Sequence, residues 1–384
     1  MPTTKTKNMV YRLMLPLFAP RCGLHPITSV SGHPLRFYHT AEKIFRKYHV
    51  LGSATILSSG NEQSLILTSS SRPHHQSDAT TFFRVASITK LATAVLTLHL
   101  AENRFVRIDD PVSRFFPAHK LPALFDSITL RHLLSHTSGI IDPPDLESAL
   151  VRGIPFPELI SHQSHIQPGI SFHYSNLAYG LIGCVLESVF QEPVSGIFNE
   201  HLFSPLQMNA TLEGCRLDQQ KIMPVTRIFP YHHGQDLILT QLGQKPLSCT
   251  DPLRHYGHTA GSMYADIDSV YRLLKVLSDE NSTFLKNTTV DEIKKQHASY
   301  GTLSPTLSYG LGLLRINDSS LSEHMIYGHQ GFAYGCADGA FWEESTGRIM
   351  ITLNGGCSES RNGRLGTANR AFLRYAFRKE LPSW

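Results

Sequence analysis

The chain lacks the sequence signatures of several common enzyme classes. None of its 384 residues forms part of a Gly-x-Ser-x-Gly pentapeptide, which marks the nucleophile of α/β-hydrolases. The His-Glu-x-x-His pattern of zinc hydrolases is also missing. The six cysteines are widely scattered and form no Cys-x-x-Cys pair, so free buried thiols are favoured over a zinc site or a disulfide framework. We therefore expect no metal ion and no cofactor.

The chain also has no large excess of charge of one sign and no long apolar run. The formal net charge is only +4 and no run of like charges stands out, so we expect no nucleic-acid partner. No segment approaches the roughly 18 unbroken apolar residues of a transmembrane helix. Lys5, Lys7 and Arg12 precede a short apolar run that contains two prolines and lacks a small-residue cleavage site. We therefore expect residues 1–35 to be a poorly ordered leader of a cytoplasmic protein, with export as the alternative.

Helical and strand-like patterns occupy different parts of the chain. The spacing of apolar residues predicts helices over about 36–49, 88–102, 178–190, 266–277 and 365–380, and strands over about 53–58, 64–69, 309–316, 325–328, 337–343 and 348–353. Strands at both ends favour an α+β fold, with one antiparallel sheet flanked by helices and a mostly helical region inserted into it. We expect one catalytic domain over 36–384, with an α/β part at about 36–105 and 260–384 and a helical part at about 106–259.

The most informative motif is Ser87-Ile-Thr-Lys90, the only Ser-x-x-Lys in the chain. Extended chain is predicted before Ser87 and helix after it, so Ser87 lies at a helix N-terminus and Lys90 on the same helical face. A serine hydroxyl needs a neighbouring base to become a nucleophile, and a lysine in a dry cleft can lose its proton near neutral pH. Taken alone, a capping serine followed by a surface lysine is the commoner explanation.

A second motif is the only Tyr-x-Asn in the chain, formed by Tyr174 and Asn176. A turn and an extended stretch lead into the predicted helix, so both side chains should face one pocket from a loop. Tyrosine can accept and pass on a proton beside a cation, and asparagine can bind a substrate amide with its donor and its acceptor. An aromatic packing residue before an asparagine helix cap explains the same pattern equally well.

The third motif is His329-Gln-Gly331, which follows the predicted strand 325–328. His-x-Gly is a weak pattern, because His232 and His255 also begin one. Only His329 lies within the C-terminal series of strands. We interpret the other two histidines as surface loop residues.

The residues after His329 are expected to form an edge strand. Gly331 in such a strand would let a substrate backbone approach closely. The backbone N–H of Phe332 would then join that of Ser87 as an oxyanion hole, in which two donors stabilise negative charge on a carbonyl oxygen.

Ser-x-x-Lys, Tyr-x-Asn and Lys/His-x-Gly, in that order, resemble the serine β-lactamase-like family, which includes class C β-lactamases, DD-carboxypeptidases, D-aminopeptidases and certain esterases. The resemblance runs from about residue 36 to 380 and includes the stretches Phe83–Lys90, Leu133–Gly139, Pro168–Gly183, His258–Met263 and Tyr309–Gly312. It implies the β-lactamase/transpeptidase-like fold and Ser87 as the acylated nucleophile. It also implies Lys90 and Tyr174 as the proton-handling pair, with Asn176 and His329 facing the substrate. Which of Lys90 and Tyr174 is the acylation base stays open.

The third motif departs from class C β-lactamases, which resemble one another in carrying Lys-Thr-Gly there; no Lys-x-Gly occurs in this chain. A histidine holds a substrate carboxylate only when protonated, so we expect activity on carboxylate-bearing substrates to rise as the pH falls towards 6. The resemblance thus favours a peptidase, amidase or esterase with poor β-lactamase activity on a small-molecule or peptide substrate. A penicillin-binding sensor with slow or no turnover and a true class C-like β-lactamase are the alternatives. The oligomeric state is not predicted.

Overall fold

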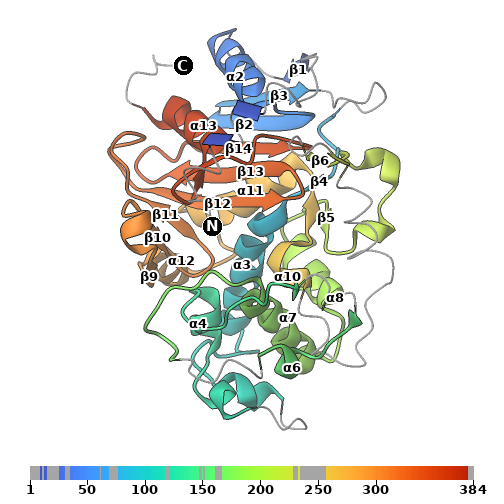
Figure 1. The fold of residues 1–384 in the computed structure, drawn as a ribbon, viewed down its shortest axis with the longest axis vertical. Coiled ribbons are helices and arrows are strands. Elements are labelled where there is room, and N and C mark those ends of the chain that lie inside the picture. The colour runs from blue at the N-terminus through green and yellow to red at the C-terminus, as the bar shows by residue number, and fades with distance from the viewer. Residues whose placement is uncertain are drawn as a thin grey trace.

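Both ends of the chain contribute strands to one antiparallel sheet (Figure 1). The computed structural model describes residues 9–10, 13–14, 26–30, 35–60, 62–68, 77–116, 122–146, 149, 152–160, 167–227, 232–233 and 257–378. Within these residues the sheet has nine strands, in the order β1 (Pro26–Val30), β3 (Glu62–Thr68), β2 (Ser53–Ser59), β14 (Ile349–Asn354), β13 (Cys336–Glu343), β12 (Ile326–Ala333), β11 (Leu314–Ile316), β10 (Leu307–Tyr309) and β9 (Ala298–Ser299). The two halves of the chain meet where β2 pairs with β14.

Helices cover both faces of this sheet, because its central strands are apolar on both sides. In β14, Ile349 and Ile351 belong to one buried cluster and Met350 to the other. The Met350 face is covered by α2 (Leu35–Tyr48) and α13 (Thr367–Phe377), which lie side by side in Figure 1. The opposite face packs against α11 (Ile267–Ser278). The sheet is therefore the middle layer of three.

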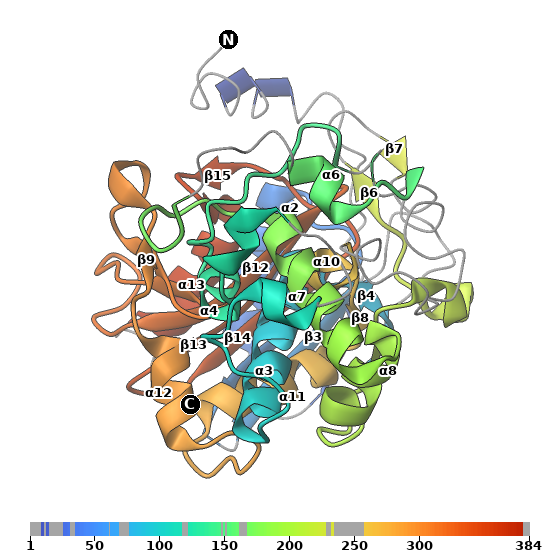
Figure 2. The same cartoon turned by 90° about the horizontal axis from the view of Figure 1, so that it is seen from below.

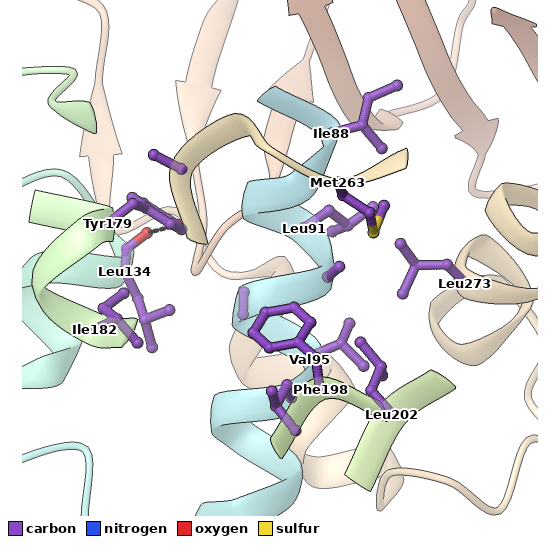
Figure 3. Close-up of a cluster of buried hydrophobic side chains, with 14 of the residues drawn as sticks. Ile88, Leu91, Val95, Leu134, Tyr179, Ile182, Phe198, Leu202, Met263 and Leu273 are labelled. Carbon is purple, nitrogen blue, oxygen red and sulfur yellow. Dashed lines mark hydrogen bonds between the residues drawn. The ribbon is translucent and has the colours of Figure 1, made fainter. Parts of the chain in front are cut away.

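The helix α3 (Thr89–Glu102) forms the centre of the larger core (Figure 3). Its sequence is rich in alanine and leucine, which favour helix, and it is apolar on most of its surface. Leu91 and Val95 belong to the same buried cluster as Phe198 and Leu273, which come from other helices. The helix predicted over about 88–102 is confirmed, and most of its residues are buried.

The middle of the chain is mostly helical, as predicted. It contains α4 (Leu130–Leu134), α6 (Phe156–Ile160), α7 (Asn176–Phe190), α8 (Val194–Phe198) and a π-helical segment at Asn199–Phe203, followed by α10 (His258–Gly261) and α12 (Asn287–Lys294). Figure 2, which is seen from below, shows α3, α7 and α10 grouped in front of the sheet. Smaller strand groups are β4 (Phe83–Arg84) with β8 (Tyr264–Ala265) and β5 (Ala210–Thr211), β6 (Thr226–Arg227) with β7 (His232–His233), and β15 (Arg361–Asn362) with β16 (Leu365–Gly366). The α+β fold class is confirmed.

Three predicted boundaries need correction. The strand β1 lies inside the segment 1–35 that was expected to be a leader, so the sheet begins before residue 36. The predicted strand 309–316 is two strands, β10 and β11. The chain leaves the sheet between them at Gly312, where a Cβ atom would collide with Ala94 of α3. The last helix begins at Thr367 rather than Leu365.

The four cysteines within the described residues are free thiols, and of these only Cys215 is exposed; Cys22 and Cys249 lie outside these residues. No single helix in the same part of the chain is long and apolar enough to cross a bilayer. Only α7 together with the segment Val194–Phe203 passes that test, as a pair bent by 89°.

Candidate active site

Ser87 lies in a short 3-10 turn, Ala86–Ile88, between β4 and α3. The preceding residue, Ala86, has a φ of +46°, a backbone conformation that costs energy for any residue except glycine. β4 pairs with β8, and the backbone N–H of Val85 donates to Met263 O at 3.0 Å. These contacts hold the turn in place and present a half-buried Ser87 at the start of the helix.

Lys90 is fully buried one helical turn after Ser87, and its amine faces three oxygen atoms. The Nζ atom lies 3.3 Å from Ser87 Oγ, 2.7 Å from Asn176 Oδ1 and 2.7 Å from Ala260 O. Burial lowers the pKa of Lys90 to about 7, because the charged form loses its hydration; the nearby Asp142 carboxylate opposes this change, and the Arg84 cation adds to it. The amine is therefore poised between its charged and neutral forms at neutral pH.

Tyr174 lies two residues before α7, with its ring 4.9 Å from Lys90 Nζ. Burial raises the pKa of Tyr174 well above its ordinary value, and a hydrogen bond with Ser87 only partly opposes this rise. The phenol is therefore protonated at neutral pH. Ser87, Lys90 and Tyr174 thus form one contiguous group, as the motifs predict.

Asn176 is the first residue of α7, and Asp142 fixes its amide. The Nδ2 of Asn176 donates to Asp142 Oδ2 at 2.9 Å, and the same carboxylate accepts from the backbone N–H groups of Asn176 and Leu177 and from Ser175 Oγ. Each end of the amide keeps room for one further hydrogen bond, so its proposed contact with substrate stays a prediction. Sequence reasoning missed Asp142, because 34 residues separate it from Asn176 and no local pattern marks it.

Aromatic rings pack against the ring of Tyr174. His136 is fully buried, with its ring centroid 4.3 Å from that of Tyr174 and 4.9 Å from that of Tyr309. Its Nδ1 accepts from the backbone N–H of Ser175 at 3.1 Å, which requires the neutral ring, and burial keeps its pKa well below the ordinary value. Sequence reasoning treated the Leu133–Gly139 stretch as a family landmark and assigned no role to His136.

His329 lies in β12 but is not a pH-dependent cation, which corrects the sequence-based expectation. Only 3% of the residue is exposed. Its Nδ1 lies 2.8 Å from Gln330 O and therefore carries the proton, so Tyr309 donates its hydroxyl to Nε2 at 2.8 Å. Burial, with the Lys90 charge as a smaller cause, lowers the pKa of His329 to about 3. The ring is therefore neutral at neutral pH.

The strand edge after His329 lies beside the nucleophile. β11 pairs only with Ile326–Gly328 of β12, so within the described residues no strand covers that edge of residues 329–333. A Cβ atom at Gly331 would collide with Val85 O, so the glycine makes room for the turn that carries Ser87. The close approach of a substrate backbone at Gly331 stays a prediction. Phe332 follows on the same strand. Its backbone N–H remains a predicted member of the oxyanion hole.

Neither of the other two His-x-Gly sequences lies entirely within the described residues. His232 lies in β7, paired with β6. His255 lies outside the described residues. Among the described residues, His329-Gln-Gly331 is the His-x-Gly that packs against the turn carrying Ser87.

The sequence model of the family described as Beta-lactamase matches residues 38–352, which cover all the groups described above. This chain belongs to the beta-lactamase family. Family membership accounts for the order of the three motifs and for the antiparallel sheet flanked by helices. It leaves the substrate open, because members of one fold carry different activities.

Among characterised relatives, the esterase EstB of Burkholderia gladioli is 25% identical over 382 aligned residues, which cover 86% of this chain and 92% of EstB. The protein flp of Staphylococcus aureus (strain MW2) is 32% identical over 146 residues, and the match spans 34% of this chain and only 28% of flp. A solved structure, the D-amino acid amidase of Ochrobactrum anthropi SV3 complexed with L-phenylalanine, is similar with a TM-score of 0.67 and 22% identity. That match covers 88% of this chain and 94% of the amidase.

Proposed function

We propose that this beta-lactamase family member is a serine hydrolase that forms a covalent acyl-enzyme at Ser87 on an amide or ester substrate. The observation that carries the proposal is the position of Lys90 Nζ, 3.3 Å from Ser87 Oγ, in a buried site where the lysine pKa is about 7. A base with this pKa is matched to proton transfer at neutral pH. The esterase and amidase names of two similar proteins agree with the proposal.

Lys90 is the base that this geometry favours for acylation. A neutral amine has two N–H donors and one lone pair. Asn176 Oδ1 and Ala260 O, each at 2.7 Å, are oxygen acceptors and occupy both donors. The lone pair is then directed at the hydroxyl of Ser87. Tyr174 is the weaker candidate, because its raised pKa makes a tyrosinate unfavourable in the free enzyme.

The proposed reaction proceeds through two acyl transfers. As Ser87 Oγ bonds to the substrate carbonyl carbon, its proton passes to Lys90. When the tetrahedral intermediate collapses, the bond from carbon to the leaving nitrogen or oxygen breaks, and that atom receives a proton through Tyr174. Water then attacks the acyl-enzyme by the reverse path, so the acid is released and Ser87 regains its proton.

The backbone N–H groups of Ser87 and Phe332 are proposed as the oxyanion hole, and Asn176 as a contact to the substrate. The edge of β12 beyond Gly328, which no described strand covers, supports this assignment, since an extended substrate can add to such an edge beside Ser87. A donor to the developing oxyanion contributes roughly 3–4 kcal/mol in enzymes of this kind. Gly331 lies on the same strand, and its lack of a side chain leaves room for the turn that carries Ser87.

We propose a peptidase, amidase or esterase with poor β-lactamase activity. The neutral His329, which stands where class C β-lactamases resemble one another in having lysine, supplies no charge to hold the carboxylate of a penicillin. The alternatives are a penicillin-binding sensor that is acylated and does not turn over, and a true class C-like β-lactamase. We also propose a cytoplasmic location and a small-molecule or peptide substrate.

The test is intact-mass measurement of the purified chain after incubation with a fluorophosphonate and, separately, with a penicillin. Covalent labelling at Ser87, absent in Ser87→Ala, is the expected result. Ser135→Ala is the matched control, because this serine lies in the Leu133–Gly139 landmark and donates to Arg131 O. Retained labelling of Ser87→Ala, or adducts mapped to another serine, would contradict the assignment.

Turnover separates the alternatives. A panel of p-nitrophenyl esters, D- and L-aminoacyl p-nitroanilides and nitrocefin should show multiple turnovers on esters or amides and little on nitrocefin. A stoichiometric burst followed by no further product would favour the sensor. Nitrocefin hydrolysis faster than that of every other substrate would favour the β-lactamase.

A further inference from the structure

A groove of about 940 Å³ lies between α2 and α13, on the face of the sheet opposite α11. It ends at Arg361 and Asn362 of the β15–β16 hairpin. Figure 1 shows the two helices near each other above the sheet. The ring of Phe37 on α2 stacks on that of Tyr375 on α13, with centroids 5.8 Å apart. This volume is within the range of small-molecule binding sites.

The groove is basic at its polar positions and apolar elsewhere. Its basic lining consists of Lys47, Arg361, Arg370, Arg374 and Arg378, and no carboxylate lines it within the described residues. Arg370 is ion-paired with Asp318 at 2.8 Å, outside the lining. Apolar and aromatic side chains make up most of the rest: Met9, Leu13, Ile44, Tyr48, Ala371 and Tyr375. An occupant with an aliphatic body and a negative charge would satisfy both kinds of surface.

Arg361 connects the groove to the candidate active site. Its guanidinium lies 4.0 Å from the ring centroid of Phe332, the residue proposed for the oxyanion hole. It also interacts electrostatically with Tyr174 and lowers the pKa of that phenol, against the larger effect of burial. One side chain therefore belongs to the lining of the groove and to the surroundings of the nucleophile.

Gln330 fixes the hairpin that carries Arg361. Its Nε2 donates to Arg364 O at 2.6 Å, and its Oε1 accepts from the backbone N–H of Gly366 at 3.0 Å. The Arg364 N–H donates in turn to Ser304 Oγ at 3.1 Å. Gln330 stands where the class C motif has a small hydroxyl residue. Its hydrogen bonds therefore connect strand β12 to the hairpin that lines the groove.

We propose that this groove is an extended subsite for substrates whose acyl chain is aliphatic and ends in an anion, such as a carboxylate. The aliphatic chain lies along the apolar lining, and the anion pairs with Arg374 and Arg378 at the far end. The inference rests on the proposed hydrolase function at Ser87. It assigns the recognition of negative charge to permanent guanidinium cations of the C-terminal helix and not to His329.

The experiment compares esters that differ only at the end of the acyl chain. The probes are the mono-p-nitrophenyl esters of adipic, suberic and sebacic acids, each measured against the neutral p-nitrophenyl ester of equal carbon number. We expect the ratio of kcat/KM, anionic over neutral, to exceed one and to increase with chain length. Raising the salt from about 0.02 M to about 0.5 M should reduce the ratio, because salt screens exposed charges.

The decisive variant is Arg374→Ala/Arg378→Ala, whose side chains are exposed and line the groove. Its ratio for the suberic and sebacic esters should fall on the order of ten-fold. The matched control is Lys43→Ala/Arg46→Ala, which removes two exposed charges from α2 outside the groove and should leave the ratio unchanged. Thermal melts of both variants show whether the fold is kept.

The outcomes separate this inference from the proposed function. Turnover of the neutral esters with a ratio near one, or an equal fall in both double variants, would overturn the subsite and leave the hydrolase intact. If neither series of esters acylates the protein, the proposed function itself is overturned.

Discussion

The Oδ1 atom of Asn176 accepts a hydrogen bond of 2.7 Å from the Nζ atom of Lys90. The orientation of this amide is fixed from the other end, because the Asp142 carboxylate can only accept and therefore binds Nδ2 at 2.9 Å. One N–H of the lysine is thus committed to Asn176 by a carboxylate that the lysine does not itself touch. The protonation state of Lys90 is then the property on which reactivity depends.

The rate of acylation should follow the titration of Lys90. With a neutral ester, we expect kcat/KM to rise about ten-fold per pH unit below pH 7 and to level off above it, since only the neutral amine accepts the Ser87 proton and its pKa is about 7. A pH–rate profile over the stable range of the protein measures this. A profile that keeps rising to pH 10 would mean that the lysine keeps an ordinary pKa.

Asp142→Asn should change both the stability and the pH profile. The side-chain amide cannot accept all four of the hydrogen bonds that the carboxylate receives, so we expect a loss of about 1–3 kcal/mol in the free energy of unfolding. Loss of the negative charge that raises the Lys90 pKa should move the acidic limb of the profile to lower pH.

Asp145→Asn is the control for this change, because that carboxylate is exposed and pairs with Arg152 on the surface. We expect it to change the free energy of unfolding by less than about 0.5 kcal/mol. Urea unfolding and pH–rate profiles of both variants measure the difference. If the acidic limb of the pH–rate profile does not shift in folded Asp142→Asn, the Asp142 carboxylate does not influence the pKa of Lys90.

Lys90 and Tyr174 should act as one unit with Ser87. We expect Lys90→Ala and Tyr174→Phe each to cost several orders of magnitude in kcat/KM and the double variant to cost little more, because either loss interrupts the same proton path. Steady-state kinetics of the three folded variants measure this. Losses that multiply would mean that the two groups do separate tasks.

His329 should not sense pH in the assay range. We expect the ratio of kcat/KM for carboxylate over neutral substrates to stay constant from about pH 8 to about pH 6, because the pKa of His329 is about 3 and the groove arginines stay charged. Measuring both substrates across this range decides it. An increase in the ratio as the pH falls would support the expectation from the sequence that a protonated His329 binds the carboxylate.

His329→Lys gives a separate test of the buried, neutral state of His329. It would bury an ammonium group and leave the hydroxyl of Tyr309 without its acceptor, so we expect a loss of more than about 2 kcal/mol in stability and no gain on carboxylate substrates. His297→Lys is the control, on a partly buried histidine beside Glu292. A stable variant with about ten-fold better carboxylate turnover would contradict the buried position of His329.

The sequence by itself determined the features that depend on local spacing. Ser87 and Lys90 are three residues apart, so the helical turn that leads from the 3-10 segment into α3 brings the hydroxyl and the amine together. Short runs of β-prone residues predicted most strands and the α+β class. The two-residue period of a strand then places neighbouring residues such as Met350 and Ile351 on opposite faces.

Only the tertiary structure decided the electrostatics. The burial of Lys90, the carboxylate of Asp142 and the cation of Arg84 together determine the lysine pKa, and the groups that bury Lys90 come from separate parts of the chain. The sequence predicted a titrating His329, but packing against Tyr309 and the removal of water keep that ring neutral. Desolvation depends on every atom around a group, so the neighbours of a residue in space, and not in sequence, determine its charge.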